Sequence, residues 1–368
     1  MNRIVPTDDV YRNVSVRAPG RVNLIGDHTD YNEGLALPMA IDLQTAVGFI
    51  ESGSGRLLLY TTFDPHPADL PVDIPFDPDV LAGITPPWAS LAAAVAAQVA
   101  APHGGVGRIT STLPSGAGLS SSAAFSVALA TALGFAAPPR VMAELCRRAE
   151  AAVGVSVGLM DPMVVTGAEA GKAMMIDFST LHFEHVSIPE DAHIVVVHSG
   201  IDRVLRATPY NARRAECEAA AVELGVPLGR AEQADLPGML DPVLRRRTRH
   251  VVTECQRVLA YADAMASGDL AAAGTLMLES HRSLAQDFEA STPRVDELVG
   301  SLASMPGVYG ARMTGGGFGG CVVALTEPGA LNPSTWGDRA WRVIPSAGVS
   351  LTERPAAPEN FEGGGDAV

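Results

Sequence analysis

The segment LPSGAGLSSSAA, residues 113–124, carries the strongest local signal in the chain. A strand pattern at 106–112 ends just before it, and an alanine-rich helical pattern at 121–133 follows. The two glycines leave backbone N–H groups open to an anion, and the helix start adds unpaired N–H groups and the positive end of a dipole. The serines can cap the helix or bind Mg²⁺. The residues alone therefore leave two interpretations open, a capped helix after a tight turn and a phosphate-binding loop.

The patterns on both sides of this loop predict an α+β chain. A single core stops growing near about 250–300 residues, so 368 residues favour two domains. We expect domains at 1–190 and 191–355, and a disordered tail at 356–368 that is rich in Pro, Gly, Asp and Glu. The expected strands are 14–16, 46–51, 57–61, 106–112, 173–178, 193–198, 308–313 and 321–325, and the expected helices are 88–99, 121–133, 139–152, 212–224, 243–267, 270–284 and 295–304.

Composition and charge exclude several classes of protein. The net charge of −15 argues against a nucleic-acid surface, which needs a basic stripe. No run of about 18 apolar residues predicts a transmembrane helix, and the N-terminus shows no signal peptide. The four cysteines are scattered singly and fit reduced thiols rather than a metal site. We expect a cytoplasmic monomer whose partners are small molecules.

Two other glycine-rich segments resemble nucleotide-binding motifs but lack their context. Residues 167–173 have three residues between the glycines where a P-loop has four, and Ala173 replaces the Ser or Thr that would hold Mg²⁺. Residues 315–320 match G-x-G-x-x-G, yet they lie between two predicted strands and open no helix. An NAD-dependent oxidoreductase is therefore disfavoured. Five glycines in six residues still predict a backbone that crowds another segment or a ligand.

A polar cluster, RVNLIGDHTDYN at residues 21–32, follows the first predicted strand. Asp27, His28 and Asp30 offer the acceptors and donors that a polyol needs, and Arg21 offers a fixed cation for a phosphate or an oxyanion. Farther along, Asp161 follows an apolar stretch. It could act as a general base, or it could cap a helix before Pro162.

Together these segments resemble the galactokinases and the wider GHMP kinases. Three motifs occur in the family's order, at residues 21–31, 113–124 and 310–320, and the likeness extends to about residue 348. Further matching stretches lie at 210–214, 280–284 and 287–296. The first motif is specific to galactokinase-type sugar kinases, and the other two mark the superfamily.

The resemblance implies a two-domain GHMP kinase fold, with an N-terminal ribosomal-protein-S5-like domain, a C-terminal ferredoxin-like α/β domain and the active site between them. The reaction would be transfer of a phosphoryl group from ATP to the anomeric hydroxyl of an aldose. Asp161 would accept the hydroxyl proton and Arg21 would stabilise the transferring group. The implied sugar ligands are Asp27, His28, Asp30, Gly158 and Tyr210. The implied ATP site comprises Trp88, Pro114, Gly116, Gly118, Ser120, Ser121 and Ser122, and the implied Mg²⁺ ligands are Ser121 and Glu150.

Several positions depart from the family pattern. Galactokinases usually carry Glu where Asp27 stands, facing the C6 hydroxyl, and a polar residue where Pro162 stands. The segment between Glu150 and Asp161 is about one residue short, and His198 replaces a common Asn or Asp. Galactose is the expected substrate, and a C6-extended heptose or octose is the alternative. A catalytically silent sugar sensor is the non-enzymatic alternative, but a pure binder needs neither Asp161 nor Arg21.

Overall fold

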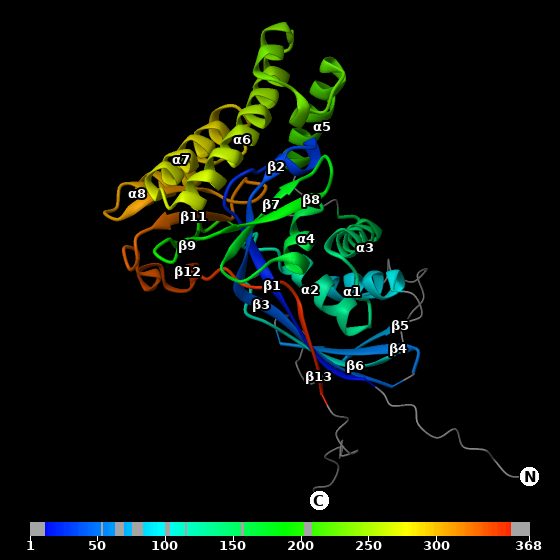
Figure 1. The fold of residues 1–368 in the computed structure, drawn as a ribbon. Coiled ribbons are helices and arrows are strands. Elements are labelled where there is room, and N and C mark those ends of the chain that lie inside the picture. Colours follow the sequence, from blue (N-terminus) through cyan, green and yellow to red (C-terminus); the bar gives the residue numbers. More distant parts are fainter. Residues whose placement is uncertain are drawn as a thin grey trace, which may run out of the picture.

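The structure is a computed structural model that describes residues 12–52, 54–62, 70–75, 84–99, 104–114, 116–155, 158–201 and 208–354. The tail predicted to be disordered, 356–368, lies outside the described residues. Helices and strands form the mixed architecture that the sequence predicts, so the α+β assignment is confirmed (Figure 1).

A six-stranded sheet organises the part of the chain that begins with β1 (Asn13–Asn23). Its order is β13-β1-β3-β6-β4-β5, and only β4 and β6 pair in parallel. The other strands are β3 (Pro38–Glu51), β4 (Arg56–Thr61), β5 (Val72–Pro75), β6 (Gly105–Ser111) and β13 (Ser350–Arg354). Helices α1 (Pro87–Gln98), α2 (Ser121–Ala132), α3 (Pro139–Ala152) and α4 (Met160–Gly167) lie on one side of this sheet (Figure 1). Because α2 is apolar on nearly every face, it is buried among the sheet and the other helices.

The second half is built around an antiparallel four-stranded sheet of order β10-β11-β9-β12. Helices α7 and α8 pack on β10, and α6 packs between α5 and α7. These strands are β9 (His193–His198), β10 (Val308–Met313), β11 (Cys321–Thr326) and β12 (Ala340–Val343), and the helices are α5 (Thr208–Leu224), α6 (Pro242–Ser267), α7 (Leu270–Gln286) and α8 (Pro293–Ala303). A small sheet of β2 (Leu35–Ala36), β7 (Lys172–Asp177) and β8 (His182–Ser187) lies between the two halves (Figure 1).

Every strand and helix expected from the sequence occurs, with ends that shift by at most four residues except in two strands: β1 continues to Asn23, and β3 begins at Pro38. The unpredicted elements are short or partly exposed: β8 alternates polar and apolar residues at an edge, and α4 is an eight-residue helix with a proline in its first turn. The predicted boundary near residue 190 falls between β8 and β9 and stays a prediction. The last strand of the chain returns to the six-stranded sheet of the first half, where β13 pairs antiparallel with β1.

The glycine cluster at 315–320 joins β10 to β11 and opens no helix, as the sequence predicts. Its backbone crowds another segment: a Cβ built on Gly317 would lie 2.3 Å from the carbonyl oxygen of Ala290. The Phe318 N–H donates to the same oxygen at 2.8 Å. Separately, no helix in the described part of the chain has both the length and the apolar character needed to cross a bilayer.

Replacing Gly317 by Ala should destabilise the fold more than replacing Gly329 by Ala. Both glycines have positive φ, near +77°, but open space surrounds Gly329. Gly329→Ala should cost about 1 kcal/mol from backbone strain, and Gly317→Ala about 2–4 kcal/mol because the methyl group also displaces the Ala290 carbonyl. Urea unfolding of both variants tests this. Equal costs would show that the close approach at Gly317 is unimportant.

Candidate active site

An ion pair between Arg21 and Asp161 joins the first strand to the start of α4. The Arg21 Nε donates to Asp161 Oδ1 and its NH2 to Oδ2, both at 2.7 Å, which is the bidentate geometry that arginine and carboxylate favour. Arg21 NH1 also donates to the Gly118 carbonyl at 2.7 Å. The Arg21 side chain is buried, whereas the Asp161 side chain stays 31% exposed. The carboxylate is thus held firmly on one side and open on the other.

Ser120 connects this pair to the loop at 113–124. Its Oγ donates to Asp161 Oδ2 at 2.5 Å, so its hydroxyl does not cap α2. Its backbone has φ +64°, a left-handed conformation that is rare for serine. The first helical hydrogen bond runs from Ala124 N to Ser120 O, so the N–H groups of residues 121–123 precede the hydrogen-bonded helix. Uncapped N–H groups at a helix N-terminus, next to Gly116 and Gly118 with positive φ, are suited to an anion.

Glu150 on α3 is a buried carboxyl group beside the same helix start. Burial raises the pKa of Glu150 to about 7, an effect that a hydrogen bond with Ser122 opposes and the charge of Asp161 adds to. The family resemblance implies that Ser121 and Glu150 hold Mg²⁺, which stays a prediction; in the structure Ser121 is exposed, and Ser122 is the serine that hydrogen-bonds Glu150. In the described part of the chain Glu150 forms no ion pair with a cationic side chain, and such a buried carboxyl group is chemically suited to Mg²⁺, which binds carboxylate and hydroxyl oxygens.

The polar cluster forms a loop, residues 23–34, that we call the polar loop. His28 has φ +64° and its Nδ1 lies 2.8 Å from the Tyr31 hydroxyl. Its ring packs against Phe288 at 4.5 Å and Tyr210 at 5.6 Å between centroids. Tyr31 and Tyr210 also meet edge to face. The first turn of α5 therefore comes close to this loop, as the predicted role of Tyr210 requires.

Asp30, in the single 3-10 turn of the polar loop (η1, Asp30–Asn32), lies against Gly158. A Cβ on Gly158 would be only 1.9 Å from Asp30 Oδ2, so glycine leaves the space that the carboxylate fills. Burial and, second to it, the charge of Asp161 raise the pKa of Asp30 to about 6. A buried acid whose pKa is raised in this way is a candidate for a functional site.

The carboxylate of Asp27 is bound by protein groups. Oδ1 accepts from Asn23 Nδ2 at 2.9 Å and from Gly315 N at 3.0 Å. Oδ2 lies 2.7 Å from Arg312 NH2. Burial raises the pKa of Asp27 despite the opposing charge of Arg312. Asp27 thus differs from Asp30, which forms no ion pair with an arginine in the described part of the chain.

Trp88 and Pro114 are two further residues of the implied ATP site. Trp88 begins α1 and meets the Phe125 ring of α2 edge to face at 6.5 Å. Its indole N–H is buried and finds no acceptor in the described part of the chain. Pro114 follows β6 and is half-buried. Their predicted contact with a nucleotide stays a prediction.

Sequence reasoning missed several residues that complete the site. Phe288 stacks on His28, and Arg312, Thr314 and Glu254 bind the polar loop from the second half of the chain. The glycine cluster and the ARMT residues before it were the available signal, since they match a family motif. Their partners lie nearly 300 residues away, so only the fold shows the contact.

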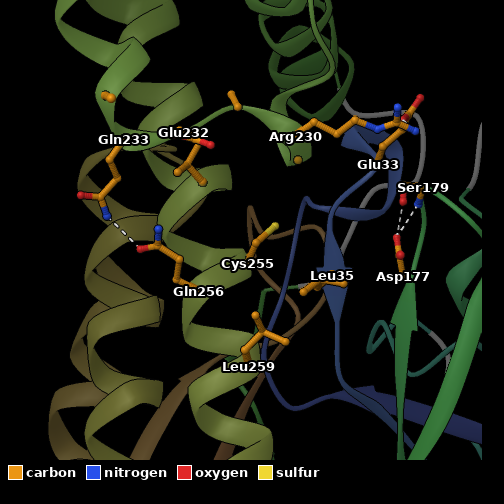
Figure 2. A pocket seen from close by; sticks show the side chains of 14 residues that line it. Glu33, Leu35, Asp177, Ser179, Arg230, Glu232, Gln233, Cys255, Gln256 and Leu259 are labelled. Carbon is orange, nitrogen blue, oxygen red and sulfur yellow. Dashed lines mark hydrogen bonds and ion pairs between the residues drawn. The ribbon is translucent and has the colours of Figure 1, made fainter.

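A cavity of about 720 Å³ behind the polar loop contains none of the predicted site residues. It is lined by α6, β2 and the end of β7, with Cys255 and Leu259 on the helix side (Figure 2). Its polar side chains pair with one another: Gln233 donates to Gln256, and Arg230 forms an ion pair with Glu33. The cavity therefore does not take part in the site described above.

Three segments match known family profiles. Residues 9–49 match the galactokinase galactose-binding signature, 89–168 the GHMP kinases N terminal domain and 261–332 the GHMP kinases C terminal. The galactokinase of Bos taurus is 40% identical over 331 residues, which cover 86% of this chain and 84% of the relative. The chain belongs to the galactokinase family. The resemblance drawn from the three sequence motifs is thereby confirmed.

Solved structures confirm the fold expected of this family. The crystal structure of Lactococcus lactis galactokinase complexed with galactose matches with a TM-score of 0.83 at 26% identity, covering 93% of this chain and 95% of that one. The Methanococcus jannaschii mevalonate kinase matches with a TM-score of 0.60 at 17% identity and shares the fold. The two-domain α+β GHMP kinase fold is therefore established for this chain.

Neutralising Glu150 should stabilise the protein at high pH. Because its folded pKa of about 7 lies above the ordinary 4.5, the ionised form destabilises the fold above pH 7, and the effect fades as pH falls toward 4.5. We expect Glu150→Gln to raise the unfolding free energy by about 2 kcal/mol at pH 8 and by little at pH 4.5. Glu144→Gln, an exposed position on the same helix paired with Arg147, is the matched control. An unchanged pH slope in Glu150→Gln would contradict this electrostatic assignment.

Proposed function

We propose that this chain phosphorylates galactose through Asp161 and Arg21, with the phosphates of ATP at the N-terminus of α2. The reaction of its family is the ATP-dependent phosphorylation of galactose at C1. The observation that supports these residue roles is that Asp161 is hydrogen-bonded to both Arg21 and Ser120. This arrangement places a partly exposed carboxylate beside the uncapped N-terminus of α2. A sugar sensor would need no such arrangement.

In this mechanism Asp161 accepts the proton of the C1 hydroxyl as its oxygen attacks the γ-phosphorus. The bond between that phosphorus and the bridging oxygen to the β-phosphate breaks, and ADP leaves with the electron pair. Arg21 lies against both Asp161 and the loop carbonyl of Gly118, and its charge would stabilise the transferring phosphoryl group. Phosphoryl transfer depends mainly on positioning and on neutralising charge, and both are supplied here.

The nucleotide would be held by Gly116, Gly118 and the N–H groups at the start of α2, with Trp88 and Pro114 toward the base. Glu150 and Ser122 would hold Mg²⁺, which neutralises phosphate charge when bound. The sequence favours Ser121 for this role, and the hydrogen bond between Ser122 and Glu150 supports Ser122 instead.

His28 and Asp30 would bind the sugar hydroxyls, with Gly158 shaping the space and Tyr210 covering His28. The case for a C6-extended aldose depended on room beside a shorter, sugar-facing Asp27. Because that carboxylate is bound by Asn23, Gly315 and Arg312, the space argument loses its support and galactose is the proposed substrate. The cytoplasmic location and monomeric state stay predictions from the sequence.

Asp161→Asn should lower kcat for galactose by about 10²–10⁴-fold, because the amide cannot take the proton. ADP release from ATP and Mg²⁺ is measured with galactose, talose, glucose, N-acetylgalactosamine and C6-extended galacto-configured aldoses. Asp263→Asn, an exposed position on α6, makes the same chemical change away from the site. Full activity in Asp161→Asn would exclude Asp161 as the base. Galactose binding without ADP release in the unmutated protein would support the sensor, and turnover only with longer sugars would support the heptose or octose alternative.

Gly158→Ala should weaken sugar binding more than ATP binding. The added methyl group would displace the Asp30 carboxylate, which lies 1.9 Å from the Cβ position. We expect the KM for galactose to rise at least about tenfold while the KM for ATP changes little. Gly300→Ala, at a position with open space around it and no positive φ, controls for the general effect of an added methyl group. A parallel rise in both KM values would place Gly158 outside the sugar site.

A further inference from the structure

A buried arginine on β10 ties the polar loop to the second half of the chain. Arg312 is fully buried, and its NH1 donates to the carbonyl oxygens of Leu24 at 3.1 Å and Asn23 at 3.4 Å. Its NH2 lies 2.7 Å from Asp27 Oδ2. One guanidinium therefore holds both the backbone and the carboxylate of the loop.

Glu254 on α6 completes the charge balance around this arginine. Its Oε1 lies 3.6 Å from Arg312 NH2 and accepts from Gly26 N at 3.0 Å and Ser280 Oγ at 2.5 Å. Burial alone would raise its pKa, but Arg257, His250 and Arg312 lower the pKa of Glu254 to about 2. The polar loop is thus bound by an ionised group on a second element.

Further hydrogen bonds also connect the second half of the chain to the polar loop. Thr314 Oγ1 donates to Asn23 O at 2.9 Å and accepts from Asn23 N at 3.0 Å. His250 Nε2 lies 3.1 Å from Asp27 O. These contacts come from α6 and from the residue that follows β10, which the chain reaches more than 220 residues after the polar loop.

The contacts leave no accessible face on the Asp27 carboxylate. Oδ1 already accepts two hydrogen bonds, and Oδ2, which accepts no hydrogen bond, is shielded from solvent and lies beside Arg312. A sugar hydroxyl that displaced Arg312 from Oδ2 would break the ion pair. Breaking it would leave a charge buried without a partner, which is strongly unfavourable.

We infer that Asp27 is a positioning residue rather than a sugar ligand, and that with Arg312 and Glu254 it fixes the polar loop so that His28 and Asp30 face the substrate. The identity of the sugar in this inference rests on the proposed function. The coupling between Asp27 and Arg312 does not depend on the proposed function.

The first experiment tests whether the network of Asp27, Arg312 and Glu254 affects sugar binding by positioning the polar loop. Asp27→Asn, Arg312→Gln and the double variant are compared with Arg249→Gln, which removes a half-exposed arginine on α6 outside the network. We expect each single variant to raise the Kd and KM for galactose at least about tenfold, with the KM for ATP unchanged. The double variant should be far less than additive, because the two residues act as one unit. A merely structural role would lower the folded fraction and kcat instead, and additive effects would overturn the inference.

The second experiment tests direct contact with each hydroxyl. Calorimetry gives Kd values for galactose and for its 2-, 3-, 4- and 6-deoxy analogues, in the unmutated protein and in Asp27→Asn. A positioning residue leaves the penalty for each missing hydroxyl unchanged within about threefold. Loss of one penalty in Asp27→Asn would show that Asp27 binds that hydroxyl and would overturn the inference. If Asp27→Asn does not fold, the double variant, which leaves no unpaired buried charge, serves in the same comparison.

Hydrogen exchange separates a failure of this inference from a failure of the proposed function. Absence of both galactose binding and ADP release in the unmutated protein would contradict the proposed function only. The inference then rests on exchange of residues 23–34, which should be faster in Asp27→Asn and Arg312→Gln than in Arg249→Gln. Unchanged exchange in these variants would overturn it.

Discussion

The bidentate contact between Arg21 and Asp161 is the interaction on which the site depends. It joins residues 140 positions apart, one on β1 and one in the first turn of α4. Ser120 donates to the same carboxylate and Gly118 accepts from the same guanidinium, so the glycine-serine loop is held in place by the pair. Because the Ser120 hydroxyl donates to Asp161, it does not cap the N-terminus of α2. The helix thus lacks a side-chain cap at the place where we propose that the phosphates of ATP bind.

Around this contact, the protein buries acids that would be more stable in water. The pKa values of Asp30 and Glu150 are raised to about 6 and about 7, chiefly by burial. Such groups destabilise the fold when ionised, and sugar hydroxyls or a cation would relieve part of that cost. The buried Glu254 instead has two arginines and a serine for partners, and its pKa is lowered to about 2. This contrast distinguishes Glu254, which holds the polar loop, from Asp30 and Glu150, which we propose as ligands of the sugar and of Mg²⁺.

The glycine cluster at 315–320 shows how a motif can be misleading when it is read without its surroundings. It matches a dinucleotide fingerprint, yet it is a tight connection between β10 and β11 that passes close to Ala290. The Gly315 N–H binds Asp27, and Arg312 and Thr314 just before it bind the start of the polar loop. Residues of the third family motif, 310–320, therefore hold the polar loop of the first motif in place. The C-terminal half supports the sugar-facing loop although it supplies few groups to the site itself.

The sequence by itself determined the family, the α+β class and the expected strands and helices, and it singled out Arg21 and Asp161 as candidate site residues. These follow from local patterns, since periodicity, glycine turns and motif order are written in adjacent positions. Tertiary structure alone decided the pairing of β13 with β1, the contact of Ser122 rather than Ser121 with Glu150, and the enclosure of Asp27 by Arg312 and Gly315. The reason is physical: each of these depends on a long-range packing or on which face of a helix turn points inward, and a side chain's neighbours across 290 residues leave no mark in its local sequence.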